Sequence, residues 1–304
     1  MYAAIVTGAS GQDGSYMCEL LTGKGYHVKR LVGDVCNYHN IHRLLIECMC
    51  YERVEIYNLA AKIHKDTLPV NTLGIFNILE AVRENDTQGK CRVFQASSSE
   101  MFGNTQEVPQ NEKTVCNPRS VYGISKMTGY WLSKNYRENH GIYVSSGILY
   151  NHESPRRSDI YVTQKIIKGL KNGNCINIGN LESRRDWGHA KDYVEAMWLS
   201  LQQEKSDDYI IATGKTYTVR EFIEMTAIKL NKTIVWSGQG ISEVGIIDSE
   251  IAVKVSKEFY RPDDNTLLMG DPSKLEYLGW KRNFDIHGLI ESMLNRNELT
   301  ESFS

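Results

Sequence analysis

The sequence has no apolar run long enough to cross a bilayer, and no basic segment precedes its first strand-like residues, Met1 to Val6. A transmembrane helix needs about 20 apolar residues and a secretory signal begins with basic residues, so we expect neither and predict a cytoplasmic protein. The net charge is only -2, which argues against binding to nucleic acid or to an anionic membrane. No internal repeat or low-complexity linker interrupts the chain.

Patterns for disulfides and metals are also absent. The seven cysteines form an odd number without a CxxC pair, which fits reduced thiols and not a disulfide framework. Cys48 and Cys50 are too close in sequence to form half of a zinc site, and the histidines are scattered. We therefore predict no metal.

Short β-branched and aromatic runs alternate with helical patterns, which predicts a parallel sheet covered by helices. The expected strands are Ala3–Thr7, Tyr26–Val32, Glu55–Ala61, Arg92–Ala96, Tyr143–Leu149 and Tyr209–Ala212. We expect an α/β fold with a doubly wound, Rossmann-like sheet. Its dinucleotide-binding domain would comprise residues 1–150, with 191–213 packing back onto it, and 151–304 would form a smaller substrate-binding domain. After Ala212 we expect only short helices and turns.

A glycine-rich turn joins the first expected strand to a helical stretch, Ser15 to Leu21. Strand, glycine turn and helix are the order that points backbone N–H groups and a positive helix end at a pyrophosphate. The spacing is GxxGxxG, and its glycines let the turn close and let phosphate and strand approach. We expect dinucleotide contacts at Gly8, Ser10, Gly11, Gln12, Asp13 and Gly14. The third expected strand ends in Leu59, Ala60 and Ala61, small or apolar residues that leave room for a cofactor.

Ser98, Glu100, Tyr122 and Lys126 are the candidate catalytic residues. A strand delivers Ser98 and Glu100 at its C-terminal end, where open parallel sheets bind ligands; the alternative is a loop that caps itself. Tyr122 and Lys126 lie four residues apart on a helix expected to end near His140, so both side chains share one face. An ammonium beside a phenol favours the phenolate, which can act as a base near neutral pH.

The Tyr-x-x-x-Lys spacing is not specific. It recurs at Tyr130–Lys134, Tyr161–Lys165 and Tyr277–Lys281. The first of these copies falls later on the same helix, where we expect surface or packing roles. Only Tyr122 comes directly after Ser98 and Glu100, so we interpret this copy as the catalytic pair.

Two pairs of adjacent arginines follow expected strand ends. Arg156 and Arg157 lie in a polar loop after Leu149, and Arg184 and Arg185 precede a helix expected at 191–203. Adjacent arginines are usually solvated. Beside a nucleotide pocket, however, their guanidinium groups suit bidentate phosphate binding.

Together these motifs resemble the GDP-mannose 4,6-dehydratase family of extended short-chain dehydrogenases/reductases. The motifs are Thr7–Gly14, Asn58–Ala61, Gln95–Glu100, Arg119–Gly123, Asn151–Arg157, Arg185–Tyr193 and Tyr260–Pro262. The match extends nearly end to end. Asn151–Arg157 and Arg185–Ala190 are far more specific than the glycine and tyrosine–lysine signatures.

The resemblance implies a lyase that converts GDP-mannose to GDP-4-keto-6-deoxymannose with bound NADP, in GDP-fucose biosynthesis and nucleotide-sugar metabolism. It implies that Tyr122, assisted by Lys126, takes the C4 hydroxyl proton while hydride leaves C4. Glu100 would then remove the C5 proton and help to expel the C6 hydroxyl as water, with Ser98 as a hydrogen-bonding partner.

The resemblance also implies further binding residues. His152 and Arg157 join the cofactor contacts. The candidates for holding the GDP-sugar are Asn151, Lys165, Arg185 and Arg261.

Two segments are shorter than in the family, one after Arg30 and one between His64 and Val70. In the family the first contains a loop that binds the NADP 2′-phosphate and a helix that builds subunit contacts. Asp34 could bind an adenosine ribose hydroxyl and so select NAD. Because of the shortening we prefer to align Asp34 and Val35 with the family's Gly-Asp-Leu/Val element near the adenine. Arg30 or Lys29 could then reach the 2′-phosphate.

The family resemblance leaves two alternative functions open. The chain could be a catalytically degenerate nucleotide-sugar-binding homologue that pairs with an intact enzyme. It could also be another NDP-sugar dehydratase or epimerase of the same superfamily. The family forms tetramers, so the partners expected are GDP-mannose and further copies of the chain, as a dimer or tetramer.

Overall fold

The structure is a computed structural model that describes residues 1–63, 66–260 and 267–295. Within these ranges a six-stranded parallel sheet has the order β10-β5-β4-β3-β1-β2. Its strands are β1 (Tyr2–Thr7), β2 (His27–Arg30), β3 (Arg53–Asn58), β4 (Cys91–Ser98), β5 (Val144–Leu149) and β10 (Asp208–Ile211). The predicted doubly wound parallel sheet is confirmed, although β2 and β3 end earlier than expected.

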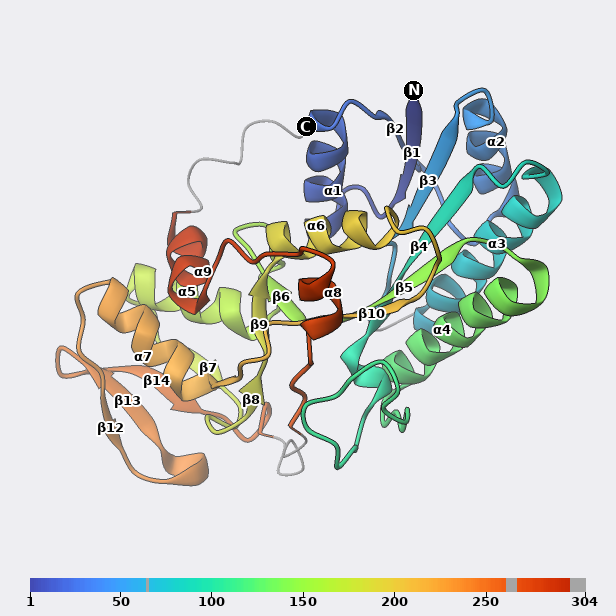
Figure 1. The fold of residues 1–304 in the computed structure, drawn as a ribbon. Helices are drawn as coiled ribbons and strands as arrows, with labels where there is room; N and C mark the ends of the chain where they lie inside the picture. Colours follow the sequence, from blue (N-terminus) through green and yellow to red (C-terminus); the bar gives the residue numbers. More distant parts are fainter. Residues whose placement is uncertain (64–65, 261–266, 296–304) are drawn as a thin grey trace.

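Helices cover both faces of this sheet (Figure 1). On one face lie α1 (Gln12–Gly23) and α6 (Ala190–Ser200), and on the other lie α2 (Tyr38–Cys48), α3 (Gly74–Asn85) and α4 (Val121–His140). Successive strand residues point to opposite faces, and both faces are buried. The first core contains Val6, Tyr57, Phe94, Met17 and Met197, and the second contains Ile5, Ile56, Val93, Leu45 and Ile78. Each such side chain contributes about 1.5–3 kcal/mol by burial.

The strand order reverses at β1, which lies between β2 and β3. Val6 pairs with Arg30 of β2, and Thr7 pairs with Asn58 of β3. The C-terminal ends of all three strands are therefore adjacent. In an open α/β sheet this reversal point is where ligands bind.

The rest of the described chain has its own apolar core, formed in part by Ile166, Phe222, Val253 and Leu289. Three helices, α5 (Val162–Asn172), α7 (Val219–Lys229) and α9 (Ile286–Leu294), pack with a four-stranded sheet. Its strands are β12 (Val235–Ser237), β13 (Val244–Ile247), β14 (Glu250–Val255) and β7 (Ile176–Ile178). The prediction of only short helices and turns after Ala212 is wrong. The strands are too short for a clear alternating pattern, and β7 joins the sheet from a distant segment.

Short strands connect the two parts of the molecule. β6 (Asn151–Glu153) pairs with β9 (Trp187–His189), and β8 (Arg184–Arg185) pairs with β11 (Tyr217–Thr218). The prediction of a polar loop after Leu149 is therefore wrong for its first residues. Asn151–Glu153 forms a strand whose partner strand lies over 30 residues away in the sequence.

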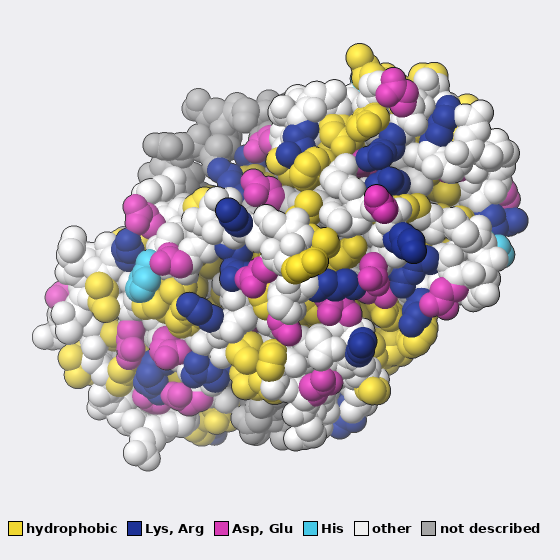
Figure 2. Space-filling model, viewed as in Figure 1, with side chains coloured by type: hydrophobic (Ala, Val, Ile, Leu, Met, Phe, Trp, Pro, Cys, Tyr) yellow, Lys and Arg dark blue, Asp and Glu magenta, His cyan; other side chains and the backbone are white. Residues whose placement is uncertain are grey.

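The structure also bears on disulfides, membrane spans and surface charge. All seven cysteines lie in the described ranges, and all are free thiols. Among the residues that the structure describes, no helix combines the length and apolarity that a membrane span requires. Figure 2 shows acidic and basic side chains interspersed over the visible face, so no large patch of one sign covers it.

Candidate active site

The glycine turn after β1 lies against the residues that follow β3. Gly8 has φ +64°, and a Cβ at this position would lie 2.8 Å from the Ala60 nitrogen, so only glycine fits. The Thr7 hydroxyl accepts hydrogen bonds from the backbone N–H groups of Leu59 and Ala60, both at 3.0 Å. α1 begins with Gly11 as its N-cap and has no side-chain cap. Its first N–H groups can therefore bind a phosphate, and the turn fits a dinucleotide.

The start of α1 is locked to β6. Asp13 and His152 are joined between Oδ2 and Nε2 at 2.8 Å, and the other ring nitrogen of His152 lies 2.7 Å from the Tyr150 carbonyl oxygen. Burial alone would raise the pKa of Asp13, but the charge and hydrogen bond of His152 lower it. For His152, burial alone would lower the pKa, but the charge and hydrogen bond of Asp13 raise it above its ordinary value. Gln12 adds a bond to the His152 carbonyl oxygen at 3.1 Å. The structure thus brings the predicted cofactor residues Gln12, Asp13 and His152 together.

Replacing Asp13 with asparagine should destabilise the protein most in mildly acidic solution. Because the pKa of His152 is raised in the folded protein, its pairing stabilises the fold fully at pH values below the ordinary pKa of 6.5. This stabilisation is lost as the pH rises through the pKa of the folded state. The lowered pKa of Asp13 means that its contribution is present above 3.8 and is lost as the pH falls through its folded value. Asp13→Asn should therefore lower the free energy of unfolding by about 2 kcal/mol at pH about 5.5, and by less at pH about 8.5.

Denaturant unfolding at both pH values measures this difference. Asp207→Asn is the control, because it removes an exposed ion pair with Lys274, and we expect a small effect with no such decline between the two pH values. An Asp13→Asn effect that stayed constant between these pH values would contradict the role of the Asp13–His152 pair.

A row of buried polar groups runs from the glycine turn to the candidate catalytic lysine. The Thr7 hydroxyl donates to Asn58 Oδ1 at 2.9 Å, and Asn58 Nδ2 donates to Gln95 Oε1 at 2.7 Å. Gln95 Nε2 donates to the Ala96 carbonyl oxygen at 3.2 Å, which also accepts from Lys126 Nζ at 2.8 Å. This row fixes Lys126 at the C-terminal end of β4.

Lys126 and Tyr122 share one face of α4, as predicted. The Lys126 ammonium lies 5.8 Å from the centre of the Tyr122 ring. Burial lowers the pKa of Lys126 to about 8, although Asp13 acts in the opposite direction. Burial and the charge of Glu100 raise the pKa of Tyr122, while a hydrogen bond with Ser98 opposes the rise. The phenol is therefore neutral at pH 7, whereas the sequence predicted that Lys126 would favour the phenolate.

Glu100 and Ser98 lie at the N-terminal end of α4. Ser98 Oγ accepts from the Glu100 N–H at 3.2 Å and caps a single 3₁₀ turn, Ser99–Met101. The self-capping alternative is therefore observed, but it uses only the backbone of Glu100. Its exposed carboxylate accepts from Ser120 Oγ at 2.8 Å. A Cβ at Gly123 would lie 2.7 Å from the Glu100 carbonyl oxygen, so this glycine lets α4 approach the turn.

Three supporting residues were not identified from the sequence. Ser120 caps α4 by accepting from the Gly123 N–H at 2.9 Å, and the same hydroxyl binds Glu100. Asn71 Nδ2 donates to Ser125 Oγ at 2.9 Å, and Ser125 Oγ donates to the Tyr122 carbonyl oxygen at 2.7 Å. A serine at a helix start is a recognisable N-cap signal. Asn71 has no comparable signal, because its partner lies 54 residues away.

Two rival Tyr-x-x-x-Lys copies lie outside the site. The Tyr130 hydroxyl is buried and donates to Asp208 at 3.0 Å, and Arg137 also binds that carboxylate. Tyr277 is 92% exposed. The third copy begins at Tyr161, whose ring lies under the Arg157 guanidinium at 3.5 Å.

The adjacent arginines after β6 point to different partners. Arg157 pairs with buried Glu153 at 3.0 Å. Arg156 packs on the Tyr16 ring at 3.9 Å and donates to Ser15 Oγ at 2.9 Å, and it pairs with Glu19. Arg156 therefore attaches β6 to α1, and Arg157 is the member of the pair that faces Tyr161.

The end of β2 carries the residues expected near the adenosine. Arg30 lies close enough to Cys18 on α1 for a side-chain hydrogen bond that lowers the pKa of that thiol, against the larger effect of burial. Asp34 Oδ1 accepts from the Cys36 N–H at 2.9 Å. Val35 is buried against Gly74. These residues border the same strand ends as the glycine turn.

A cavity of about 250 Å³ contains two of the predicted substrate residues, Lys165 of α5 and Arg185 of β8. Phe259 closes one side, 4.6 Å from the Lys165 ammonium. Asn151 is half-buried opposite Trp187 and does not line this cavity. Arg261, the fourth prediction, lies outside the described residues.

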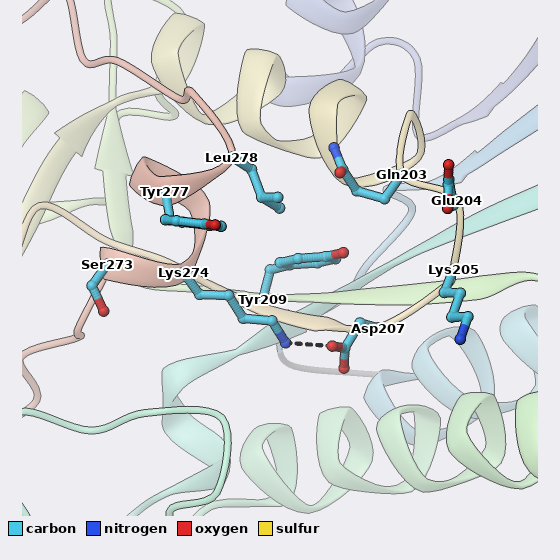
Figure 3. A pocket seen from close by; sticks show the side chains of 9 residues that line it. All are labelled: Gln203, Glu204, Lys205, Asp207, Tyr209, Ser273, Lys274, Tyr277 and Leu278. Atoms are coloured by element: carbon cyan, nitrogen blue, oxygen red, sulfur yellow. Dashed lines mark hydrogen bonds and ion pairs between the residues drawn. The ribbon is translucent and has the colours of Figure 1, made fainter.

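A second hollow, of about 750 Å³, lies beside the edge strand β10 (Figure 3). Lys274 crosses it and donates to Asp207 at 2.7 Å, as the dashed line shows. Part of its lining comes from Gln203, Glu204, Lys205 and Asp207, which lead into the amino end of β10, and the rest from Tyr209 and from the segment 273–278. The glycine turn and Lys126 lie at the carboxyl ends of the strands, so this hollow is separate from the candidate site.

Comparisons with known proteins identify the family of this chain. A sequence model of GDP-mannose 4,6 dehydratase matches residues 29–293. The GDP-mannose 4,6-dehydratase of Yersinia enterocolitica is 39% identical over 349 aligned positions, which cover 97% of this chain and 93% of that protein. The chain belongs to the GDP-mannose 4,6-dehydratase family. The family's human member is 37% identical, over 96% of this chain and 90% of its own. The predicted resemblance is confirmed. The Yersinia alignment is longer than the 304-residue chain, so it contains gaps, as expected for shortened segments.

Solved structures of more distant proteins share the fold. The dTDP-glucose 4,6-dehydratase of Bacillus anthracis, in complex with NAD, has a TM-score of 0.80 at 15% identity, and 97% of this chain and 96% of that one are covered. RMD from Pseudomonas aeruginosa, complexed with NADPH, has a TM-score of 0.77 at 19% identity, with coverage of 97% and 98%. At these identities the likeness establishes the fold alone.

Proposed function

We propose that this chain converts GDP-mannose to GDP-4-keto-6-deoxymannose and water. The observation that carries the proposal is the position of Glu100. Ser120 holds the Glu100 carboxylate at the same end of the sheet as Tyr122 and Lys126, in a chain that belongs to this family. Oxidation and re-reduction need only the tyrosine–lysine pair, whereas elimination of water also needs a group that moves the C5 proton.

A bound nicotinamide would supply the redox chemistry, as acceptor of hydride from C4 and donor to C6. Gly8, Ser10, Gly11, Gln12, Asp13 and Gly14 would hold its pyrophosphate, with contacts from Leu59, Ala60, Ala61, His152 and Arg157. Lys126 would hold its ribose and keep Tyr122 able to take a proton. The uncapped start of α1 and the absence of a side chain at Gly8 support this assignment.

The protein groups would move two protons. Tyr122 would first have to lose its own proton, which the positive charges of Lys126 and of a bound nicotinamide would favour, and the phenolate would then take the C4 hydroxyl proton. The C4 ketone acidifies the C5–H, and Glu100 removes that proton. Glu100 then delivers it to the C6 hydroxyl, which leaves as water. Ser98 would donate a hydrogen bond to the C4 oxygen. As hydride is added at C6, Tyr122 would deliver its proton to C5, so the C4 ketone is kept in the product.

Incubation of the purified chain with GDP-mannose and NADP⁺ tests this function directly. Mass spectrometry should detect a GDP-sugar that has lost one water and carries a C4 ketone. A folded chain that binds GDP-mannose without forming this product would instead be a degenerate homologue. Turnover of other NDP-sugars in place of GDP-mannose would identify a different dehydratase or epimerase.

We propose NADP as the cofactor, with Arg30 as the residue that binds its 2′-phosphate. Arg30 pairs with Val6, two residues before Gly8, and its side chain approaches α1 beside Cys18. The neighbouring Lys29 binds Glu47 of α2, at 3.2 Å. Of these two cations on β2, Arg30 is therefore the one whose side chain lies on the same side of the sheet as α1 and the glycine turn. Asp34 and Val35 would border the adenine.

Replacing Arg30 with alanine should weaken NADP⁺ binding by about 10- to 100-fold, because a charge-assisted hydrogen bond contributes about 1.5–3 kcal/mol. NAD⁺ has no 2′-phosphate, so its affinity should change little. Calorimetric titration of both cofactors measures the difference, with Lys29→Ala as control. Equal losses for both cofactors would show that Arg30 does not read the 2′-phosphate.

We also propose the domain division and a homo-oligomeric state. Residues 1–150, with 191–213, would form the dinucleotide-binding domain, and the rest from 151 would form the substrate-binding domain. This division is supported by the separate apolar core around Ile166 and Phe222. Oligomerisation is supported by exposed apolar side chains on the packed helices α3 and α4, namely Phe76, Val121, Ile124 and Trp131. Light scattering should give the mass of a dimer or tetramer, and a monomer would contradict this proposal.

A further inference from the structure

Tyr161 directly precedes α5, and contacts with neighbouring residues hold its ring in place. Arg157 lies over its ring at 3.5 Å, and Arg157 pairs with Glu153. Glu153 also accepts from Thr163 Oγ1 at 2.7 Å, two residues beyond Tyr161. Tyr161 is the N-cap of α5, yet its side chain makes no cap hydrogen bond. The ring is thus fixed by a cation–π contact and by an anchored helix start, and not by its hydroxyl.

Tyr161 lies between Ile160 and Val162 in sequence, near the catalytic groups, and its side chain does not line the substrate cavity. Its neighbours Ile160 and Val162 line the cavity that contains Lys165 and Arg185, but Tyr161 does not. Burial raises the pKa of Tyr161, Arg157 opposes the rise, and the carboxylates of Glu153, Asp13 and Glu100 add to it. In turn, Tyr161 contributes to the raised pKa of Tyr122. The two phenols and Glu100 therefore lie within electrostatic range of one another.

The hydroxyl of Tyr161 is available to a ligand. It makes no hydrogen bond to any residue within 1–63, 66–260 and 267–295, although the side chain is half-buried. With its raised pKa the group is a neutral phenol at pH 7, which can donate one hydrogen bond. Tyr161 lies next in sequence to Ile160 and Val162, which line the cavity of Lys165, and close enough to Glu100 for its charge to be felt.

We infer that Tyr161 is a sugar-binding residue whose hydroxyl donates a hydrogen bond to the hexose of the nucleotide sugar. This contact orients the ring of the sugar between Tyr122 and Glu100, while the nucleotide occupies the cavity of Lys165 and Arg185. The inference rests on the proposed function, because it takes a nucleotide sugar as the ligand. It assigns a binding role to Tyr161–Lys165, the other Tyr-x-x-x-Lys copy that lies near the site.

The Tyr161→Phe variant tests the inference, because it removes the hydroxyl and keeps the ring under Arg157. We expect the dissociation constant for GDP-mannose to rise about tenfold, as for the loss of one hydrogen bond. The constants for GDP, which has no hexose, and for NADP⁺ should stay within about twofold of wild type. In turnover, kcat/KM should fall by at least the same factor. Tyr277→Phe is the control, since that ring is 92% exposed.

Two results would overturn the inference. One is unchanged affinity for GDP-mannose. The other is an equal loss for GDP or NADP⁺, which would mean that Tyr161 acts on the nucleotide, on Arg157 or on the fold. The titrations do not depend on turnover. If wild-type protein binds GDP-mannose but makes no product, the proposed reaction fails while the contact at Tyr161 is still measured.

Discussion

Glu100→Gln should abolish dehydration but leave the first oxidation intact. Glutamine keeps an oxygen that accepts from Ser120, so the turn at the start of α4 is preserved. It cannot remove the C5 proton, and product formation should fall by about 10²–10⁴-fold, the range for loss of a general acid–base. Because Tyr122 and Lys126 are untouched, hydride can still leave C4, and reduced nicotinamide should accumulate on the enzyme.

Stopped-flow absorbance of reduced nicotinamide, combined with product analysis, measures both halves of the reaction. Glu138→Gln changes the same residue type on an exposed turn of α4 and should behave as wild type. Normal product formation by Glu100→Gln would show that another group moves the C5 proton. Loss of both halves would show that Glu100 acts before elimination.

Tyr122→Phe should stop the reaction one step earlier. The phenol that accepts the C4 proton is gone, so neither hydride transfer nor dehydration should proceed, with turnover reduced by about 10²–10⁴-fold. No reduced nicotinamide should accumulate, which separates this variant from Glu100→Gln. The ring remains, so the packing of α4 and the bond from Lys126 to Ala96 are expected to persist.

Tyr130→Phe provides a matched comparison on the same helix. Its hydroxyl binds Asp208 within the core, so its loss should lower the thermal midpoint and leave the rate per folded molecule unchanged. A Tyr122→Phe enzyme that still reduced the cofactor would refute Tyr122 as the base. A Tyr130→Phe enzyme with an equal kinetic defect would show that the effect is one of helix packing.

The sequence predicts those parts of the structure that are determined by residues close together in the chain. The glycine turn, the helix ending at His140 and the shared face of Tyr122 and Lys126 depend on residues a few positions apart. Central strands are also predictable, because both faces of the sheet are buried and the strands are continuous apolar runs.

The contacts that complete the site are not local. Asn71 reaches Ser125, and Gln12 reaches Ser154 across 142 residues. β7 and β14 pair only after the chain has folded back. Nothing in the sequence around Tyr161 indicates that its ring lies under Arg157. Such pairings depend on tertiary structure, which overrides short-range pattern in strands of three or four residues.

The polar row from Thr7 to Lys126 also limits where protons can travel. Two of its members, Asn58 and Gln95, are side-chain amides whose donor and acceptor ends are set by their neighbours. An amide does not take up and release protons as a carboxylate, an imidazole or water does. The interior of the sheet is therefore insulated. We therefore expect that a proton taken by Tyr122 is not relayed through Asn58 and Gln95, and that solvent deuterium enters the product by a route that does not pass through this row.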